Sequence, residues 1–173
     1  EERRALEAAC GYPVVGLSYA NGVYSRETIN ALRALGIVYS RTTKNTGGFR
    51  LPEDFMEWHP TCHYKEGMEK GQQFLKSMTG YFGYPKLLYI WGHAHELEHN
   101  NHWDMMEEMC TLLGGNDKIW YATNIEIYRY ITAQRSLVIS ADERMVYNPS
   151  AIPVWFSRDK IDYCIGGGEL LKL

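Results

Sequence analysis

The sequence has no apolar run near the roughly 20 residues that a helix needs to cross a membrane, and it has no cluster of Lys or Arg. Its 173 residues carry a net charge of -3, so the charge pattern gives no sign of a nucleic-acid partner. The four cysteines are scattered and include no Cys-x-x-Cys pair, which excludes a zinc-knuckle or redox motif of that kind. We therefore expect neither a membrane segment nor nucleic-acid binding.

Short apolar runs alternate with helical patterns over residues 1–135, and 45% of the chain is hydrophobic, as in globular proteins. The predicted strands span residues 13–19, 37–40, 86–91 and 118–122, and the predicted helices span residues 1–10, 25–35, 66–78, 101–113 and 123–131. From residue 136 the pattern changes to short β-like runs separated by turns. We therefore predict an α/β fold, with a partial β/α domain at 1–135, a linker at 80–85 within it, and a small antiparallel β appendage at 136–173 packed on it.

Four of the six histidines fall within ten residues, in the segment 93–102 that joins a predicted buried strand to a predicted helix. Loops in this position carry the functional residues of many α/β proteins, so we predict a polar loop at a site. His93 comes directly after Gly92, which allows a sharp turn, and an imidazole can transfer protons near neutral pH. The alternative is a loop histidine that bonds only to the backbone.

Other polar residues have competing interpretations. His95 and Glu96, with His99 and His102, are metal-ligand types, but their spacing matches no metal motif, which favours solvated loop histidines. Glu126 stands three residues after a threonine, as in a helix capping box, and this favours a structural role.

Two further segments could face the same site as the His-rich segment. His59 and His63 lie in an irregular stretch between predicted elements and could face it. The turn at residues 19–22 ends a predicted strand, and its backbone amides could donate hydrogen bonds to an anionic intermediate. A plain β-to-α turn is the alternative at 19–22.

Five segments together carry a resemblance to a known family. They are residues 6–16, 19–22, 36–42, 89–93 and 119–126, and the fourth ends in Trp91, Gly92 and His93. In their order and spacing they resemble the later portion of a polysaccharide deacetylase, of the NodB-homology or carbohydrate esterase family 4 superfamily. The resemblance implies a distorted (β/α) barrel with an incomplete strand count. It also implies hydrolysis of N- or O-acetyl groups on carbohydrate.

That family uses one divalent metal, most often zinc, held by an aspartate and two histidines of early motifs that are not found in this chain. The resemblance implies that those ligands lie ahead of Glu1. We therefore predict no metal ligand in this chain and little or no activity from it alone. The resemblance further implies an acetylated polysaccharide or oligosaccharide as partner, and a location outside the cytoplasm or at the cell envelope.

The family's motifs also suggest roles for single residues. Its Leu-His-Asp motif falls on residues 92–94, so the resemblance makes His93 the general acid, although Ala94 stands in place of the aspartate. Its Arg-x-Pro-Tyr-Gly motif falls on residues 18–22, where only the glycine is kept and the backbone amide of Asn21 becomes the expected oxyanion donor. The residues expected to contact the sugar are Tyr19, Trp58, His63, Trp91 and Glu96.

Two other functions stay open on the sequence. The first is a non-catalytic carbohydrate-binding or interaction module, in which stacking surfaces are supplied by Trp58, Trp91, Trp103 and Trp155. The second is a self-contained metallohydrolase that uses the loop residues His93, His95, Glu96 and His99.

Overall fold

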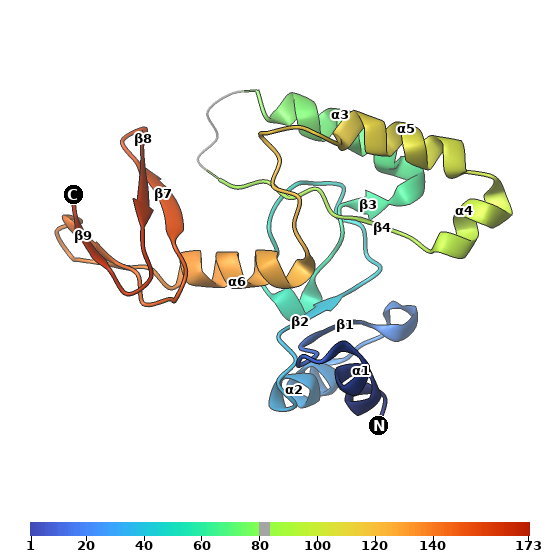
Figure 1. Ribbon diagram of the computed structural model, residues 1–173, viewed down its shortest axis with the longest axis horizontal. Coiled ribbons are helices and arrows are strands. Elements are labelled where there is room, and N and C mark those ends of the chain that lie inside the picture. Colours follow the sequence, from blue (N-terminus) through green and yellow to red (C-terminus); the bar gives the residue numbers. More distant parts are fainter. Residues whose placement is uncertain (80–83) are drawn as a thin grey trace. The chain divides into compact units, whose positions relative to one another are not determined.

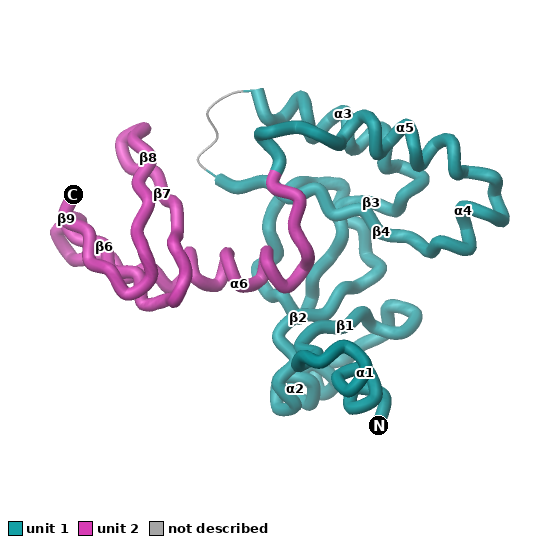
Figure 2. The backbone as a smooth tube through the Cα atoms, viewed as in Figure 1, with its two compact units in different colours: residues 1–119 teal, residues 120–173 magenta. Residues whose placement is uncertain are grey.

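The computed structural model describes residues 1–79 and 84–173, which form two units divided in the sequence between Ile119 and Trp120 (Figure 2). The linker predicted at 80–85 lies mostly outside the described residues. Unit 1 contains, in chain order, α1 (Glu2–Cys10), β1 (Gly16–Ser18), η1 (Ala20–Gly22), α2 (Arg26–Ala34), β2 (Tyr39–Arg41), η2 (Phe55–Glu57), β3 (Cys62–His63), η3 (Tyr64–Glu66), α3 (Gly67–Ser77), β4 (Ile90–Trp91), α4 (Ala94–Asn100) and α5 (Trp103–Leu113). Unit 2 contains α6 (Asn124–Arg135), β5 (Val138–Ile139), β6 (Met145–Tyr147), β7 (Val154–Arg158), β8 (Ile161–Ile165) and β9 (Leu170–Lys172). No helix in the described ranges has the length and apolar content needed to span a membrane.

Parallel strand pairs organise unit 1 (Figure 1). β1 pairs with β2, and β3 pairs with β4 so that His63 stands opposite Trp91. The segment that leads into β3 joins the two pairs, because Trp58 forms a parallel bridge with Arg41 at the end of β2. The carboxyl ends of parallel strands meet at one edge, which is where α/β folds place functional residues. No sheet among the described residues closes into a barrel, and the partial barrel stays a prediction.

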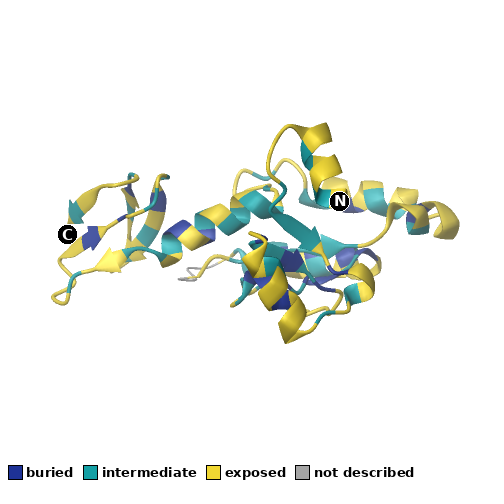
Figure 3. Cartoon of the chain, turned by 90° about the horizontal axis from the view of Figure 1, so that it is seen from below, coloured by how far each residue is buried: buried dark blue, intermediate teal, exposed yellow. Residues whose placement is uncertain are grey.

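The buried residues of unit 1 gather around these strands (Figure 3). Tyr19, Ile29, Ile37 and Met56 form one buried cluster. Trp58 is fully buried, and three aromatic rings pack against it edge-on. Each such side chain contributes about 1.5–3 kcal/mol when it is removed from water. This core holds the ends of β2 and β3 in place.

Glycines in α3 allow it to pack closely on α5. A Cβ atom on Gly67 would lie 2.3 Å from the Sδ atom of Met109, and one on Gly71 would lie 3.3 Å from the nearest methyl of Leu113. Met109 is the buried residue of α5. The two helices lie side by side in Figure 1. Their contact therefore holds the middle and the end of α5 against α3.

The structure differs from the predicted elements in two places. The segment 93–102, predicted as a loop, mostly forms α4, because Ala94 favours helix and Leu97 is buried on its inner side. Asn101 then ends α4 in the left-handed conformation, with φ 54°. The strand predicted at 118–122 is wrong, because this segment has no strand partner within the described residues and stays irregular.

Unit 2 consists of α6 and five antiparallel strands. β5, β6 and β9 form one sheet, and β7 and β8 form a hairpin. Ala133 of α6 packs with Val146, Val154 and Ile165 in a second buried cluster. The β-like runs predicted after residue 136 therefore form antiparallel strands, and α6, which the sequence pattern assigned to the first domain, groups with them.

A capping box begins α6. The Glu126 carboxylate accepts a hydrogen bond from the backbone N–H of Thr123 at 2.7 Å. Hydrogen bonds from the Thr123 hydroxyl and from its backbone lower the pKa of Glu126. The structural role predicted for Glu126 is confirmed.

Candidate functional site

β3 and β4 end next to each other, and their register places His63 against Trp91. The two rings meet edge-on, with their centroids 5.0 Å apart. Gly92 follows Trp91, and a Cβ atom there would lie 2.6 Å from Cδ1 of the buried Tyr64 ring. Glycine is therefore needed where the chain leaves β4, because the Tyr64 ring approaches the backbone so closely.

The side chains of His63 and Glu96 contact each other. The Nε2 atom of His63 lies 3.2 Å from Oε2 of Glu96, and the side chains are 19% and 23% exposed. His63 comes from the end of β3 and Glu96 from the first turn of α4. A carboxylate on one ring nitrogen fixes the orientation of the imidazole. The structure thus brings together two of the residues that the sequence assigned to substrate contact.

The hydroxyl of Tyr64 connects this pair to the end of α4. It lies 3.3 Å from Nδ1 of His102, and the side-chain amide of Asn100 donates to it at 3.4 Å. The rings of His63 and Tyr64 are also in contact, with centroids 4.6 Å apart. One histidine from the end of the His-rich segment and one from β3 therefore contact the same tyrosine.

Trp91 is held in a fixed orientation by two polar contacts. Its indole N–H donates to Oδ1 of Asn45 at 2.7 Å. The guanidinium carbon of Arg41 lies 4.8 Å from the centroid of its ring, which is a cation–π contact. Arg41 therefore covers part of the Trp91 ring, at the carboxyl ends of β2 and β4.

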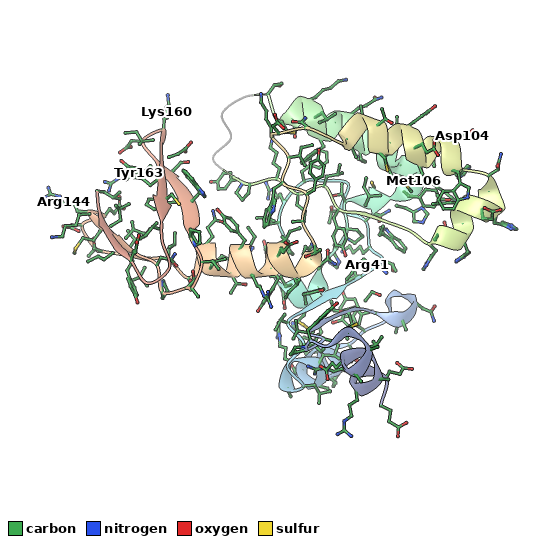
Figure 4. The ribbon with its side chains drawn as sticks, in the orientation of Figure 1. Arg41, Asp104, Met106, Arg144, Lys160 and Tyr163 are labelled. Atoms are coloured by element: carbon green, nitrogen blue, oxygen red, sulfur yellow. The ribbon has the colours of Figure 1, made fainter. Side chains whose placement is uncertain are left out.

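A pocket of about 500 Å³ opens beside Trp91. Its lining is mostly apolar with a few polar groups, as in many small-molecule sites, and consists of Arg41, Tyr64, Tyr89, Ile90, Trp91, Gly92, His93, Ala94, Leu97, Met106 and Met109. Figure 4 labels Arg41 and Met106, which come from β2 and α5. A second hollow of about 650 Å³ is lined by residues of α3 and α5, including Asp104, and contains no predicted site residue. The pocket beside Trp91 is therefore the candidate site.

His93 lines this pocket and is exposed, at the residue before α4. Its ring contacts Trp91 edge-on, with centroids 6.0 Å apart, and stacks on His95, with centroids 5.3 Å apart. No side-chain hydrogen bond joins His93 or His95 to another residue of the described parts of the chain. The imidazole nitrogens of His93 are available to a ligand.

Of the predicted site residues, Trp91 and His93 line this pocket, whereas five do not: His63, Glu96, Tyr19, Trp58 and Asn21. Tyr19 is buried and donates its hydroxyl to the carbonyl of Met56 at 2.9 Å, and burial raises the pKa of Tyr19. Trp58 has no exposed surface. Both are core residues that a sugar does not reach, which corrects their assignment to substrate contact. Asn21, the expected oxyanion donor, is exposed in η1 and does not line the pocket.

Two titratable groups near β3 also lie away from the pocket lining. Nδ1 of His59 is 2.6 Å from Oγ1 of Thr42, and burial lowers the pKa of His59. Burial raises the pKa of the Cys62 thiol to about 11. This thiol is protonated at neutral pH, so it is a poor nucleophile and a poor metal ligand.

The described residues do not form a metal site. No three side chains of His, Cys, Asp or Glu in residues 1–79 and 84–173 are grouped as the ligands of one ion. Glu96 pairs with His63 instead of joining the histidines of its own helix. The four loop residues expected for a self-contained metallohydrolase therefore do not make a ligand set. For the same reason the zinc ion implied by the family resemblance finds no matching ligands here.

Sequence reasoning did not single out four residues that shape the site. They are Arg41, Asn45, Tyr64 and Asn100. Only Arg41 had a sequence signal, because it stands directly after a predicted strand, where α/β folds expose functional side chains. The other three depend on long-range contacts that the sequence does not display.

Comparison with known proteins gives no further guidance. No protein-family model, no curated protein and no solved structure matches this chain.

Proposed function

We propose that this chain forms the sugar-binding and proton-donating part of a polysaccharide deacetylase-like site, which removes N- or O-acetyl groups from carbohydrate. The observation that carries the proposal is the position of His93. Its unshared imidazole lies on the rim of the pocket, next to Trp91, at the carboxyl end of a parallel strand. This is the residue that the resemblance identifies as the general acid.

The proposed chemistry for His93 is proton donation. When water adds to an acetyl carbonyl, the bond from the carbonyl carbon to the sugar nitrogen or oxygen breaks much faster when that leaving atom is protonated. A protonated imidazole at the pocket rim supplies that proton and becomes neutral. Since no metal ligand set is found among the described residues, we assign no step to a metal, and this proposal concerns only the leaving group.

The His63–Glu96 pair has a positioning role in this proposal. Glu96 fixes the His63 ring, and that ring packs against Trp91 at nearly a right angle. Asn45 holds the same indole through its N–H. A rigid aromatic wall is favourable for sugar binding, because less conformational freedom is lost when the ligand binds.

An acetate-release assay of the native protein tests the proposal. The substrates are N-acetylated chito-oligosaccharides and O-acetylated xylo-oligosaccharides, and binding is measured in parallel by calorimetry. Because little activity is expected from this chain alone, the assay is run at high protein concentration with added divalent metal. We expect His93→Gln to lower the residual acetate release by up to the roughly 10²- to 10⁴-fold that loss of a general acid costs, with oligosaccharide affinity nearly unchanged. His99→Gln, an exposed histidine of α4, is the matched control and should act as the wild type. Equal acetate release from His93→Gln and wild type would overturn the role of His93.

The second candidate is a carbohydrate-binding module without catalysis. Exposed tryptophans favour it, because Trp103 is 46% exposed in unit 1 and Trp155 is 56% exposed in unit 2, and sugars stack on aromatic rings. The same experiment separates the two functions. Oligosaccharide binding with no acetate release from the native protein, even at high protein concentration and under any metal supplement, favours the binding module.

A further inference from the structure

Among the described residues that line the pocket beside Trp91, Arg41 is the one with a formal charge. It is half-buried at the end of β2, and the rest of the lining is aromatic, aliphatic or thioether, apart from His93. A guanidinium loses hydration when it is partly buried, and that loss is normally offset by a carboxylate or by several hydrogen bonds. The partners of Arg41 therefore decide what the pocket can bind.

The structure gives Arg41 few partners. One side-chain N–H donates to the carbonyl of Thr42 at 3.1 Å, and the guanidinium lies over Trp91. Within residues 1–79 and 84–173, no carboxylate is within ion-pair distance of Arg41. Two other arginines of unit 1 do pair with acids, Arg3 with Glu7 at 2.9 Å and Arg33 with Asp54 at 2.6 Å. Most of the five N–H donors of Arg41 are thus left for a ligand.

The orientation of Arg41 is restricted before any ligand binds. Trp91 cannot rotate freely, because its indole N–H is bonded to Asn45 and its edge meets His63. The guanidinium plane that rests on this ring is therefore held at the pocket wall. A planar, fixed fork of N–H donors matches the two oxygens of a carboxylate, and prior ordering reduces the entropy lost on binding.

We propose that this pocket contains a carboxylate-binding subsite in which Arg41 receives an anionic group of the ligand. One cation in a largely apolar pocket suits a carboxylate with a single negative charge. The apolar part of the ligand would contact Leu97, Met106 and Met109. If the proposed function is correct, on which this part of the inference rests, the substrates are acidic polysaccharides that carry uronic acids. Acetate, the product of deacetylation, is the other source of the same chemical group.

Calorimetric titration of the full chain distinguishes these sources. The probes are an O-acetylated xylo-oligosaccharide bearing one glucuronic acid, the same oligosaccharide without that acid, and sodium acetate. We expect the acidic oligosaccharide to bind wild type about 10- to 100-fold more tightly than the neutral one, as for a hydrogen-bonded charge pair. The preference should shrink as salt is added, because free ions screen the pair.

Substitutions then assign the preference to Arg41. Arg41→Gln should bind both oligosaccharides equally, and Arg41→Lys should keep part of the preference, since it keeps the charge but not the planar fork. Arg26→Gln, an exposed arginine at the start of α2, is the matched control and should keep all of it. Circular dichroism of each variant confirms that it is folded.

Each outcome has a defined meaning. A preference for the acidic oligosaccharide that needs Arg41 supports a uronic-acid subsite. Acetate binding that needs Arg41, without that preference, supports the carboxylate subsite with the product as its ligand. Binding of both oligosaccharides with equal affinity, unchanged in Arg41→Gln and with no Arg41-dependent acetate binding, overturns the subsite while the sugar site stands. Acetate binding through Arg41 with no oligosaccharide binding keeps the subsite and contradicts the proposed function.

Discussion

Asn148 in unit 2 and Arg41 in unit 1 are polar side chains in opposite situations. Asn148 is fully buried, and its amide nitrogen donates to the carbonyls of Ile152, Ile165 and Gly166. Its amide oxygen accepts from the backbone and the hydroxyl of Ser150. Arg41, half-buried in a pocket, has one internal side-chain hydrogen bond and a ring beneath it. The hydrogen-bonding groups of Asn148 are all used within the chain, whereas most N–H donors of Arg41 are not.

Internal hydrogen bonding separates structural polar groups from those that can bind a ligand. A buried group whose hydrogen bonds are all internal stabilises the fold, because removing it leaves its partners unsatisfied. A group with unused donors beside a pocket contributes little to stability but can bind a ligand. His59 and His93 show the same contrast, since His59 is bonded to Thr42 and His93 has only ring contacts.

The largest effect on stability is expected at Asn148. Asn148→Ala leaves three carbonyls and the Ser150 donors without this partner, so we expect the free energy of unfolding to fall by roughly 2–4 kcal/mol. Urea denaturation followed by fluorescence and circular dichroism measures the change. Asn30→Ala, at an exposed position of α2, is the matched control and should change stability by about 0.5 kcal/mol or less. A loss at Asn148 no larger than at Asn30 would contradict the structural role of the saturated amide.

A smaller effect is expected at Gly92, in the pocket wall. Gly92→Ala places a Cβ atom against the buried ring of Tyr64, and we expect a loss of roughly 1–3 kcal/mol, as for other overpacked sites. The matched control is Gly48→Ala, because a Cβ on Gly48 meets nothing within 4 Å. If Gly92→Ala is as stable as Gly48→Ala, the close approach of Tyr64 does not shape the pocket.

Local sequence patterns predicted most helices and the strands of unit 2. They failed where contacts between distant parts of the chain determine the secondary structure. The apolar run at 118–122 has the composition of a strand, yet strand formation depends on a partner, which this segment lacks among the described residues. The His-rich segment has the composition of a loop, yet burial of Leu97 stabilises α4. The spacing of apolar residues in so short a segment does not distinguish a strand from irregular structure, or a loop from a helix.

The candidate site was predicted in part. His63, Trp91, Glu96 and His93 were all named from the sequence, and the structure places them around the ends of β3 and β4. Their pairing was not foreseen, because it depends on the strand register and on α4. Trp58 was expected at the sugar, since residue type alone does not separate an aromatic core residue from a stacking surface.

The smallest expected effect concerns His59 and the pH dependence of stability. Burial lowers the pKa of His59 in the folded chain, followed by the charge of Lys44, while the ordinary value is about 6.5. The unfolded chain therefore binds a proton at His59 more readily than the folded chain does. The stability contributed by neutral His59 is present above pH ~6.5 and is lost as the pH falls through the lowered pKa.

Unfolding free energies measured by urea denaturation between pH 8 and pH 5 test this expectation. We expect His59→Asn to reduce the loss of stability below pH ~6.5 relative to wild type, because the protonation difference between folded and unfolded states disappears. His99→Asn, at an exposed position of α4, should leave the pH dependence unchanged. An identical pH dependence in His59→Asn and wild type would show that the buried imidazole does not distinguish the two states. In that case the contrast between internally bonded His59 and ligand-available His93 would rest on hydrogen-bond geometry alone.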